Sequence, residues 1–229
     1  MESKLSEITD EYGALRVTLE SMIAFPAVLA VGSASMEDGT GEVACNLARA
    51  FAEAGHRTAI VDPYGGETIS AKLGLETRQV RDIARLSAGA VNGAIPNLST
   101  IVIGAAARPG KLSSRRIREA AANLKQSFDV VLVDVGQFRN SSIGLSFAAV
   151  SDGVMLAFRL GRKPLLHEKE VMLRLESVKA KVLGVVATGG PESVVPPTQA
   201  TPEKGFELKD LVETNDSAAT AAPHAVAVG

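Results

Sequence analysis

Residues 27–55 read AVLAVGSASMEDGTGEVACNLARAFAEAG, a short apolar run followed by a turn-rich join and a longer apolar-periodic run. The run at 27–34 shows no alternation of polar and apolar residues, which predicts a strand buried on both faces. The pattern at 41–55 predicts an amphipathic helix that packs against that strand. Because a buried strand that leads directly into a helix is half of a βαβ unit, this stretch predicts a parallel α/β sheet.

The rest of the chain repeats this alternation. With 229 residues and 46% hydrophobic content, it is long enough to bury one substantial core. We therefore predict one α/β domain at 25–190, a doubly wound and mostly parallel sheet with helices on both faces. Further strands are predicted at 58–62, 98–104, 128–136, 153–160 and 181–189, and further helices at 113–126 and 164–178.

The two ends differ from the domain in composition. Residues 1–24 are predicted to contribute an amphipathic helix, over 4–23, whose apolar stripe packs on the domain. From 191 to 229 the chain is rich in Pro, Ser, Thr and Ala, which predicts a disordered tail. Residues 206–213 could form a short helix on a partner, but a solvated segment is the favoured interpretation. The apolar stripe consists of Leu5, Ile8, Tyr12, Leu15, Leu19 and Met22.

Charge and hydropathy exclude several classes of protein. The net charge of -2 gives no electrostatic case for binding nucleic acid or an anionic membrane. The longest apolar run, Phe25–Val31, is far too short to span a bilayer, and the acidic N-terminus is unlike a signal peptide. We therefore expect a cytoplasmic protein without direct membrane insertion. Cys45 is the only cysteine, so no internal disulfide can form.

The join at 35–40 occupies the place of a phosphate-binding P-loop. In the motif G-x-x-x-x-G-K-[ST], backbone N–H groups surround the phosphates, the Lys reaches the β/γ oxygens, and the hydroxyl binds Mg²⁺. When the motif is aligned on Gly39, Thr40 stands at the Lys and Gly41 at the hydroxyl residue, with Glu42 one place beyond. The loop therefore stands at the position of a nucleotide site but lacks the Lys and the metal-binding hydroxyl of that site.

Three acidic residues in this segment oppose a bound phosphate. A carboxylate held about 4 Å from a phosphate charge costs roughly 4 kcal/mol at an effective dielectric of 20, and the segment carries Glu37, Asp38 and Glu42. The helix N-terminus offsets part of this repulsion. We therefore expect no catalysis and at most weak binding of ATP or ADP with Mg²⁺, and we expect Glu37 and Asp38 to lie on an exposed partner-binding surface.

Over residues 9–190 the chain resembles the MinD/ParA-like P-loop superfamily, and most closely the bacterial tyrosine autokinases (BY-kinases) of capsule and exopolysaccharide synthesis. The order and spacing of seven pieces carry the resemblance. It implies a P-loop NTPase-like fold. The pieces are EYGALR (11–16), VGSASMEDGTGEVACNLARAFAEAG (31–55), TAIVD (58–62), KLGLE (72–76), FDVVLVD (128–134), SDGVMLAFRLGRK (151–163) and KVLGVVATG (181–189).

The sequence also departs from the BY-kinase pattern at the phosphate, metal, base and acceptor positions, although Asp62 and Asp134 are kept. Where these kinases read D-A-D after the second strand, this chain reads Asp62-Pro63-Tyr64, and Thr188 replaces the Asn that contacts the adenine. The D-T-P-P of Walker B has become Asp134-Val135-Gly136-Gln137, and the tyrosine-rich tail is missing. For Asp62 and Asp134 we favour loop capping over retained Mg²⁺ binding. The vestigial nucleotide site is predicted to comprise Gly39, Thr40, Gly41, Glu42, Asp62 and Asp134.

Three functions remain open. The favoured one is a catalytically inactive BY-kinase-like protein that binds the cytoplasmic segments of a membrane polysaccharide copolymerase and is thereby recruited to the inner face of the membrane. The alternatives are a degenerate MinD/ParA-like positioning protein and a weak ATPase or tyrosine kinase with an atypical P-loop. A homo-oligomer is left open, because Asp10, Gly13 and Arg16 stand where the family's ring-forming E-x-x-R-x-x-R occurs.

Overall fold

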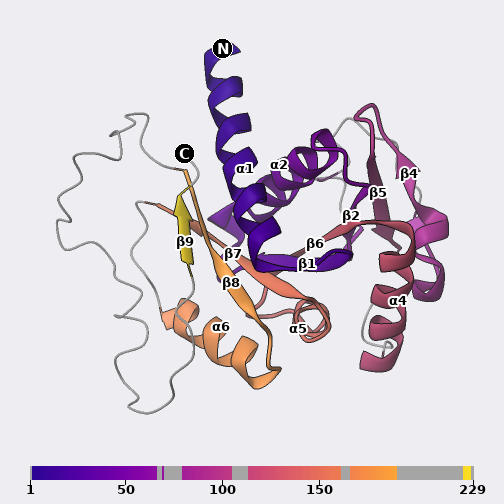
Figure 1. Ribbon diagram of the computed structural model, residues 1–229. Coiled ribbons are helices and arrows are strands. Elements are labelled where there is room, and N and C mark those ends of the chain that lie inside the picture. The colour runs from indigo at the N-terminus through magenta and orange to yellow at the C-terminus, as the bar shows by residue number, and fades with distance from the viewer. Residues whose placement is uncertain are drawn as a thin grey trace.

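The computed structural model describes residues 2–65, 69, 79–104, 113–160, 166–189 and 224–227. Within these ranges the strands form one sheet, whose order is β3-β5-β2-β6-β1-β7-β8-β9 (Figure 1). Neighbours along this order are parallel, and only β4 pairs in the antiparallel sense, with β5. The strands are β1 Ala27–Ser33, β2 Thr58–Asp62, β3 Gln79–Val80, β4 Val91–Asn92, β5 Leu98–Ile103, β6 Val130–Gln137, β7 Gly153–Arg159, β8 Val182–Thr188 and β9 His224–Ala227.

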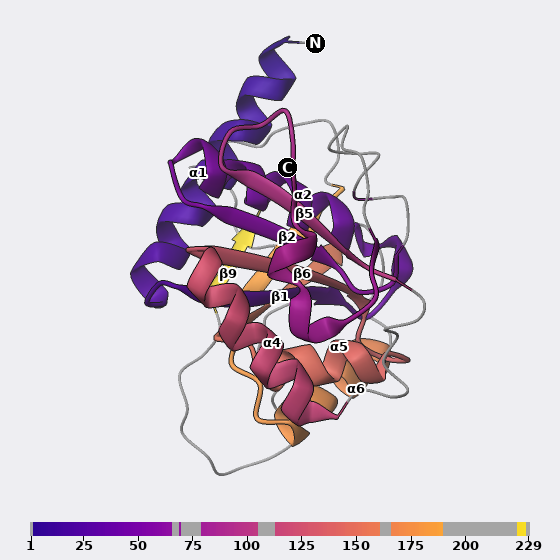
Figure 2. The same ribbon diagram turned by 90° about the vertical axis from the view of Figure 1, so that its right-hand side faces the viewer.

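Helices cover both faces of this sheet, which confirms the predicted doubly wound α/β architecture. One face carries α1 and α2, and the other carries α4, α5 and α6 (Figure 2). Short 3₁₀ turns complete the described elements. The helices are α1 Glu2–Met22, α2 Thr40–Glu53, α4 Ser114–Ser127, α5 Ser142–Ala148 and α6 Leu166–Ser177, and the turns are η1 Met36–Asp38, η2 Ile83–Arg85 and η3 Ser87–Gly89.

Strand β1 lies between two apolar layers, one on each face of the sheet. Its side chains alternate between them: Val28 and Ala30 pack beneath α4 and α5, whereas Leu29 and Val31 pack beneath α1 and α2. Every residue of β1 is buried, as the unbroken apolar run predicts. The loop that follows β1 therefore starts from a fully buried strand.

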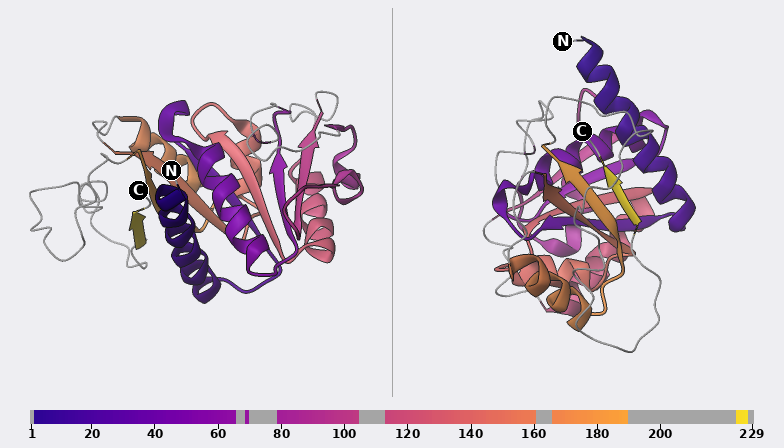
Figure 3. Two further views of the ribbon diagram at one scale, coloured as in Figure 1. Left: turned by 90° about the horizontal axis from the view of Figure 1, so that it is seen from above. Right: turned by 90° about the vertical axis from the view of Figure 1, so that its left-hand side faces the viewer.

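Helix α1 packs along α2, as the sequence predicts for the N-terminal segment (Figure 3). Tyr12, Leu15 and Leu19 are buried between the two helices, and Met22 packs against the same cluster. The side chains of Leu5 and Ile8 lie outside the described part of the structure. Within the described residues, no helix has the length and apolar character needed to cross a membrane.

The structure differs from the predicted elements at α5 and at the C-terminal segment. Helix α5 was not predicted; it begins where Ser141 Oγ accepts a hydrogen bond from Gly144 N at 2.8 Å. The prediction of a disordered tail over 191–229 is wrong at His224–Ala227, which pair in parallel with β8. An edge strand presents unpaired N–H and C=O groups that a short β-prone segment can satisfy. Residues 191–223, 72–76 and 161–163 lie outside the described residues.

Candidate functional site

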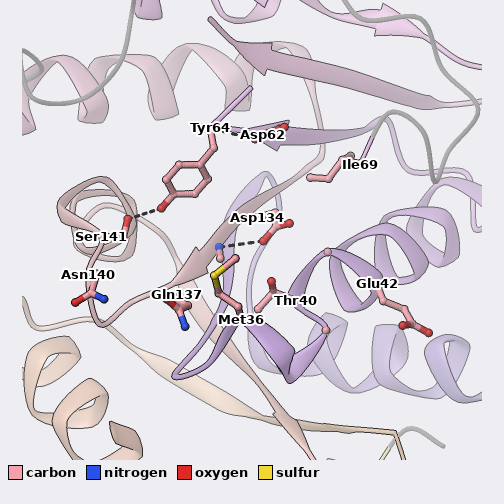
Figure 4. A pocket seen from close by; sticks show the side chains of 13 residues that line it. Met36, Thr40, Glu42, Asp62, Tyr64, Ile69, Asp134, Gln137, Asn140 and Ser141 are labelled. Atoms are coloured by element: carbon pink, nitrogen blue, oxygen red, sulfur yellow. Dashed lines mark hydrogen bonds between the residues drawn. The ribbon is translucent and has the colours of Figure 1, made fainter. Parts of the chain in front are cut away.

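A cavity of about 550 Å³ opens where β1, β2 and β6 end and α2 begins (Figure 4). This is the edge at which parallel α/β sheets bind ligands. All six residues predicted for the vestigial site line it, so the structure brings them together. The cavity is lined by Met36, Gly39, Thr40, Gly41, Glu42, Asp62, Tyr64, Ile69, Asp134, Gly136, Gln137, Asn140 and Ser141.

Asp38, in the loop between β1 and α2, forms hydrogen bonds with backbone amides around it. Asp38 is fully buried, and its carboxylate accepts hydrogen bonds from Ser35 N at 2.9 Å and from Arg159 N at 3.3 Å. Buried backbone amides require an acceptor, and Asp38 supplies it both to Ser35, at the start of η1, and to Arg159 of β7. The expectation that Asp38 is exposed is therefore wrong, whereas Glu37 and Glu42 are exposed as expected.

The other side of this loop is held by β8. Thr188 Oγ1 donates a hydrogen bond to Asp38 O at 2.9 Å, and a Cβ built at Gly39 would lie 3.7 Å from the same hydroxyl. Gly39 itself has φ +76°, a left-handed conformation that favours glycine and that turns the chain into α2. Thr188 thus fastens the loop to the sheet in this structure.

The two strand-end carboxylates cap their own loops. Asp62 Oδ1 accepts hydrogen bonds from Tyr64 N at 2.8 Å and Gly65 N at 3.1 Å, and Asp134 Oδ1 accepts one from Gly136 N at 3.0 Å. These contacts confirm the predicted capping. A Cβ built at Gly41 would lie 3.2 Å from Asp134 Oδ2, so the Asp134 carboxylate sits against the first turn of α2.

Tyr64 bridges two sides of the cavity. It stands where BY-kinases have their second acid, and its phenol donates a hydrogen bond to Val135 O at 2.8 Å and is hydrogen-bonded to Ser141 Oγ (Figure 4). Burial is the main reason that the pKa of the phenol is raised; the Ser141 hydrogen bond opposes the shift, and the charges of Asp134 and Asp62 add to it. A neutral hydroxyl therefore occupies the place of a carboxylate.

Sequence reasoning noted the loss of the acid at position 64 but did not predict the role of Tyr64 or of Ser141. The available signals were a tyrosine directly after a strand-end Asp and a pair of serines before a short apolar run. Neither signal indicates a contact between segments 77 residues apart. Only the pairing of β2 with β6 brings them together.

These residues do not fit a Mg²⁺–nucleotide. Among the described residues the lining holds no Lys or Arg, Gly41 has no hydroxyl for the metal, and Asp38 already satisfies a loop amide. Among the described residues, no group of three or more His, Cys, Asp or Glu could hold a metal ion.

No family model matches the sequence. The chain is 25% identical over 180 residues to the succinoglycan biosynthesis transport protein ExoP of Rhizobium meliloti (strain 1021), an alignment that covers 69% of this chain and 22% of ExoP. The matched part is thus about a fifth of the length of ExoP.

Solved structures share the fold. The chimerical protein CapA2B2 superposes with a TM-score of 0.64 at 20% identity over 79% of this chain and 84% of that one. The kinase domain of the Escherichia coli tyrosine kinase ETK gives 0.62 at 17% identity over 76% and 71%. MinD from Aquifex aeolicus gives 0.62 at 17% identity over 81% and 77%.

The chain thus shares the fold of BY-kinase and MinD structures, and part of its sequence is similar to ExoP. The cavity described above lies where β1 leads into α2, the place of the P-loop motif in the sequence. At that position Thr40 and Gly41 stand where the motif has its Lys and its hydroxyl residue.

Proposed function

We propose that this chain is a catalytically inactive, BY-kinase-like protein that acts in exopolysaccharide or capsule biosynthesis and export. The observation that supports the proposal is that side chains of the loops after β1 and β2 are engaged in hydrogen bonds within the protein. Asp38 accepts from the amide of Ser35, and Tyr64 donates to Val135 O and is hydrogen-bonded to Ser141 from the position of an acid. Because phosphoryl transfer depends on positioned cations around the phosphates, a site without a Lys and a metal hydroxyl lacks the groups that stabilise the transition state.

The proposed role is to bind a partner. ExoP is named for succinoglycan biosynthesis and transport, and its similarity to this chain supports a place in the same kind of process. The proposed partner is a membrane polysaccharide copolymerase, whose cytoplasmic segments would recruit this protein to the inner face of the membrane. A positioning role like that of MinD has equal support from the fold, but the sequence similarity to ExoP favours the polysaccharide role.

Calorimetry and a phosphate-release assay test the inactive site. We expect millimolar ATP affinity at best in the presence of Mg²⁺ and no turnover. Micromolar affinity, or turnover that Asp134→Ala abolishes, would contradict the proposal.

A pull-down with the cytoplasmic segments of a membrane polysaccharide copolymerase tests the partner role. We expect that ATP and ADP leave the binding unchanged. A nucleotide can alter partner binding only if it binds one conformation of the protein more tightly than another. Absence of binding, or binding that requires ATP, would contradict the role.

A further inference from the structure

Strand β9 is attached to the sheet only along β8. It is the last strand in the sheet order, and it runs parallel to β8 with His224 opposite Gly184 and Ala227 opposite Ala187 (Figure 1, Figure 3). Among the described elements, β8 alone makes an extensive contact with β9. A strand that is held along a single edge belongs to the least stable parts of a fold. We therefore expect β9 to detach before the strands that have a neighbour on each side.

Strand β8 does not depend on β9 for its place in the sheet. It pairs with β7 from Val182 to Thr188. Its side chains enter both apolar layers: Val185 packs on the side of α4, α5 and α6, whereas Leu183 and Val186 pack on the side of α1 and α2. The edge of β8 therefore persists when β9 leaves, and its N–H and C=O groups are then available to another strand.

The edge of β8 is longer than the segment that covers it. Strand β8 has seven residues and β9 has four, so Val182, Leu183 and Thr188 have no counterpart in β9. A longer strand can pair with more of this edge than β9 does. Neither strand carries the Lys or Pro by which edge strands resist pairing with another chain.

We propose that the edge of β8 is a docking site for an extended segment of the partner protein, which pairs in parallel with β8 and displaces β9. The segment would be an uncharged strand without proline, longer than the four residues of β9. This inference rests on the proposed function, because the displacing segment belongs to the partner named there. Strand β9 is then an intrachain competitor that covers the edge while the partner is absent.

The tether of β9 favours this occupant over a second copy of the chain. Roughly 35 residues lie between Thr188 and His224, more than the dozen or so that a parallel connection requires, so β9 reaches β8 of its own chain. Such a tether holds β9 near β8 at an effective concentration on the order of 1 mM. The β9 of another copy at micromolar concentration cannot compete with that. A longer partner strand can, because it adds pairs that β9 does not make.

The register of the strands identifies the amides that report the docking. Leu160 N donates to Thr188 O at 2.8 Å, so the peptide group of Thr188 faces β7. The peptide groups of successive strand residues face opposite neighbours. Val186 therefore faces β7 as well, whereas Val185 and Ala187 face β9.

Hydrogen exchange in the full-length chain, followed by NMR, tests the attachment of β9. By the same alternation the N–H of Val226 faces β8 and that of Ala225 faces away. Val226→Pro removes a donor to β8, and Ala225→Pro, the matched control, leaves the pairing intact. We expect the Val185 amide to exchange about tenfold faster than the Val186 amide, and Val226→Pro to accelerate the exchange of Val185 alone. Equal exchange of the two amides, or no response of Val185 to Val226→Pro, overturns the inference.

A synthetic peptide of residues 224–229, acetyl-His-Ala-Val-Ala-Val-Gly-amide, tests whether the edge accepts a strand from outside. Its twin is N-methylated at the first valine, the counterpart of Val226, and lacks the same donor. We expect the peptide to bind the Val226→Pro variant about tenfold more tightly than the wild type, whose own β9 competes. Bound peptide should also slow the exchange of Val185 again. Equal binding to the two proteins, or equal binding of the two peptides, overturns the inference.

Partner binding separates the docking site from the proposed function. Val226→Pro should bind the cytoplasmic segments of the copolymerase about tenfold more tightly than the wild type, Ala225→Pro should match the wild type, and the peptide should compete. Partner binding that neither Val226→Pro nor the peptide changes overturns the inference and leaves the function intact. No partner binding by any of the three proteins contradicts the function, and with it the partner as the occupant. Light scattering that finds the Val226→Pro variant dimeric at micromolar concentration would make a second copy the occupant and overturn the inference.

Discussion

At the scale of single residues, two neighbouring acids in the loop after β1 have opposite roles. Asp38 is fully buried and bonded to two backbone amides, whereas Glu37 is exposed. Asp38→Ala should therefore lower the free energy of unfolding by about 1–3 kcal/mol, the cost of leaving buried donors without a charged acceptor. Glu37→Ala, the matched control, should change it by less than about 0.5 kcal/mol. Urea denaturation measures both, and equal effects would contradict the assigned roles.

Tyr64 and Ser141 should be energetically coupled. Tyr64→Phe removes the hydroxyl that is bonded to Val135 O and Ser141 Oγ, and it should cost about 1 kcal/mol of stability. Ser141→Ala also removes the cap of α5 and should cost a similar amount. Because the two side chains share a hydrogen bond, the double variant should lose less than the sum of the single variants. Strict additivity in thermal or urea unfolding would contradict the bridge.

Thr40→Lys should not restore catalysis. The variant regains the cation of a P-loop, but Gly41 still lacks a hydroxyl, Asp38 still occupies a loop amide, and a neutral Tyr64 still stands in the place of an acid. Catalytic groups act together, so restoring one of them does not restore activity while the others are missing. Phosphate release should therefore stay at background. A BY-kinase with an intact P-loop is the positive control. Steady turnover in Thr40→Lys would show that position 40 is the only lesion.

At the scale of elements, the attachment of α1 should weaken in acid. Burial opposes ionisation of Glu20, but hydrogen bonds from Arg16 at 2.6 Å and from His56 at 2.9 Å outweigh it and lower its pKa below the ordinary 4.5. A lowered folded-state pKa gives stability that is complete above the unfolded value and disappears as the pH falls through the folded value.

Glu20→Gln should therefore destabilise the protein by about 0.5–1 kcal/mol at pH 7. The difference from the wild type should shrink as the pH falls below about 4.5, the ordinary value of the carboxyl. Urea denaturation as a function of pH measures it, with Glu53→Gln as the control. A difference that stays constant with pH would assign the effect to packing.

The elements that follow from local pattern could be predicted. Strand β1 and helix α2 appear within a few residues of their predicted bounds, because an unbroken apolar run and a 3.6-residue period are properties of the segment itself. Strand β9 and the Tyr64 bridge could not, because each depends on a neighbour that is distant in sequence. Helix α5 was missed although its Ser141 cap is local. The six site residues were grouped correctly because strand ends share one edge, but the burial of Asp38 depends on β7 and β8.

At the scale of the whole molecule, nucleotide should barely affect thermal stability. A ligand stabilises the folded state by RT ln(1 + [L]/Kd), which is about 0.4 kcal/mol when the concentration equals Kd and about 4 kcal/mol at a thousand times Kd. With millimolar affinity, millimolar ATP and Mg²⁺ should raise Tm by no more than about 2 °C. A rise in Tm of about 8 °C or more in a thermal scan would reveal micromolar binding and contradict the proposal that the nucleotide site is inactive.

The two tyrosines give the molecule an optical property of its own. The sequence has no tryptophan, so its ultraviolet emission comes from Tyr12, buried between α1 and α2, and Tyr64, at the cavity. In a Tyr12→Phe background the emission would come from the cavity alone. The Tyr64 hydroxyl is hydrogen-bonded to Val135 O and lies near two carboxylates. The fluorescence intensity of Tyr64 would therefore rise or fall when those contacts change. The protein thus carries a fluorophore of its own at the cavity, whose emission would report any ligand that disturbs these contacts.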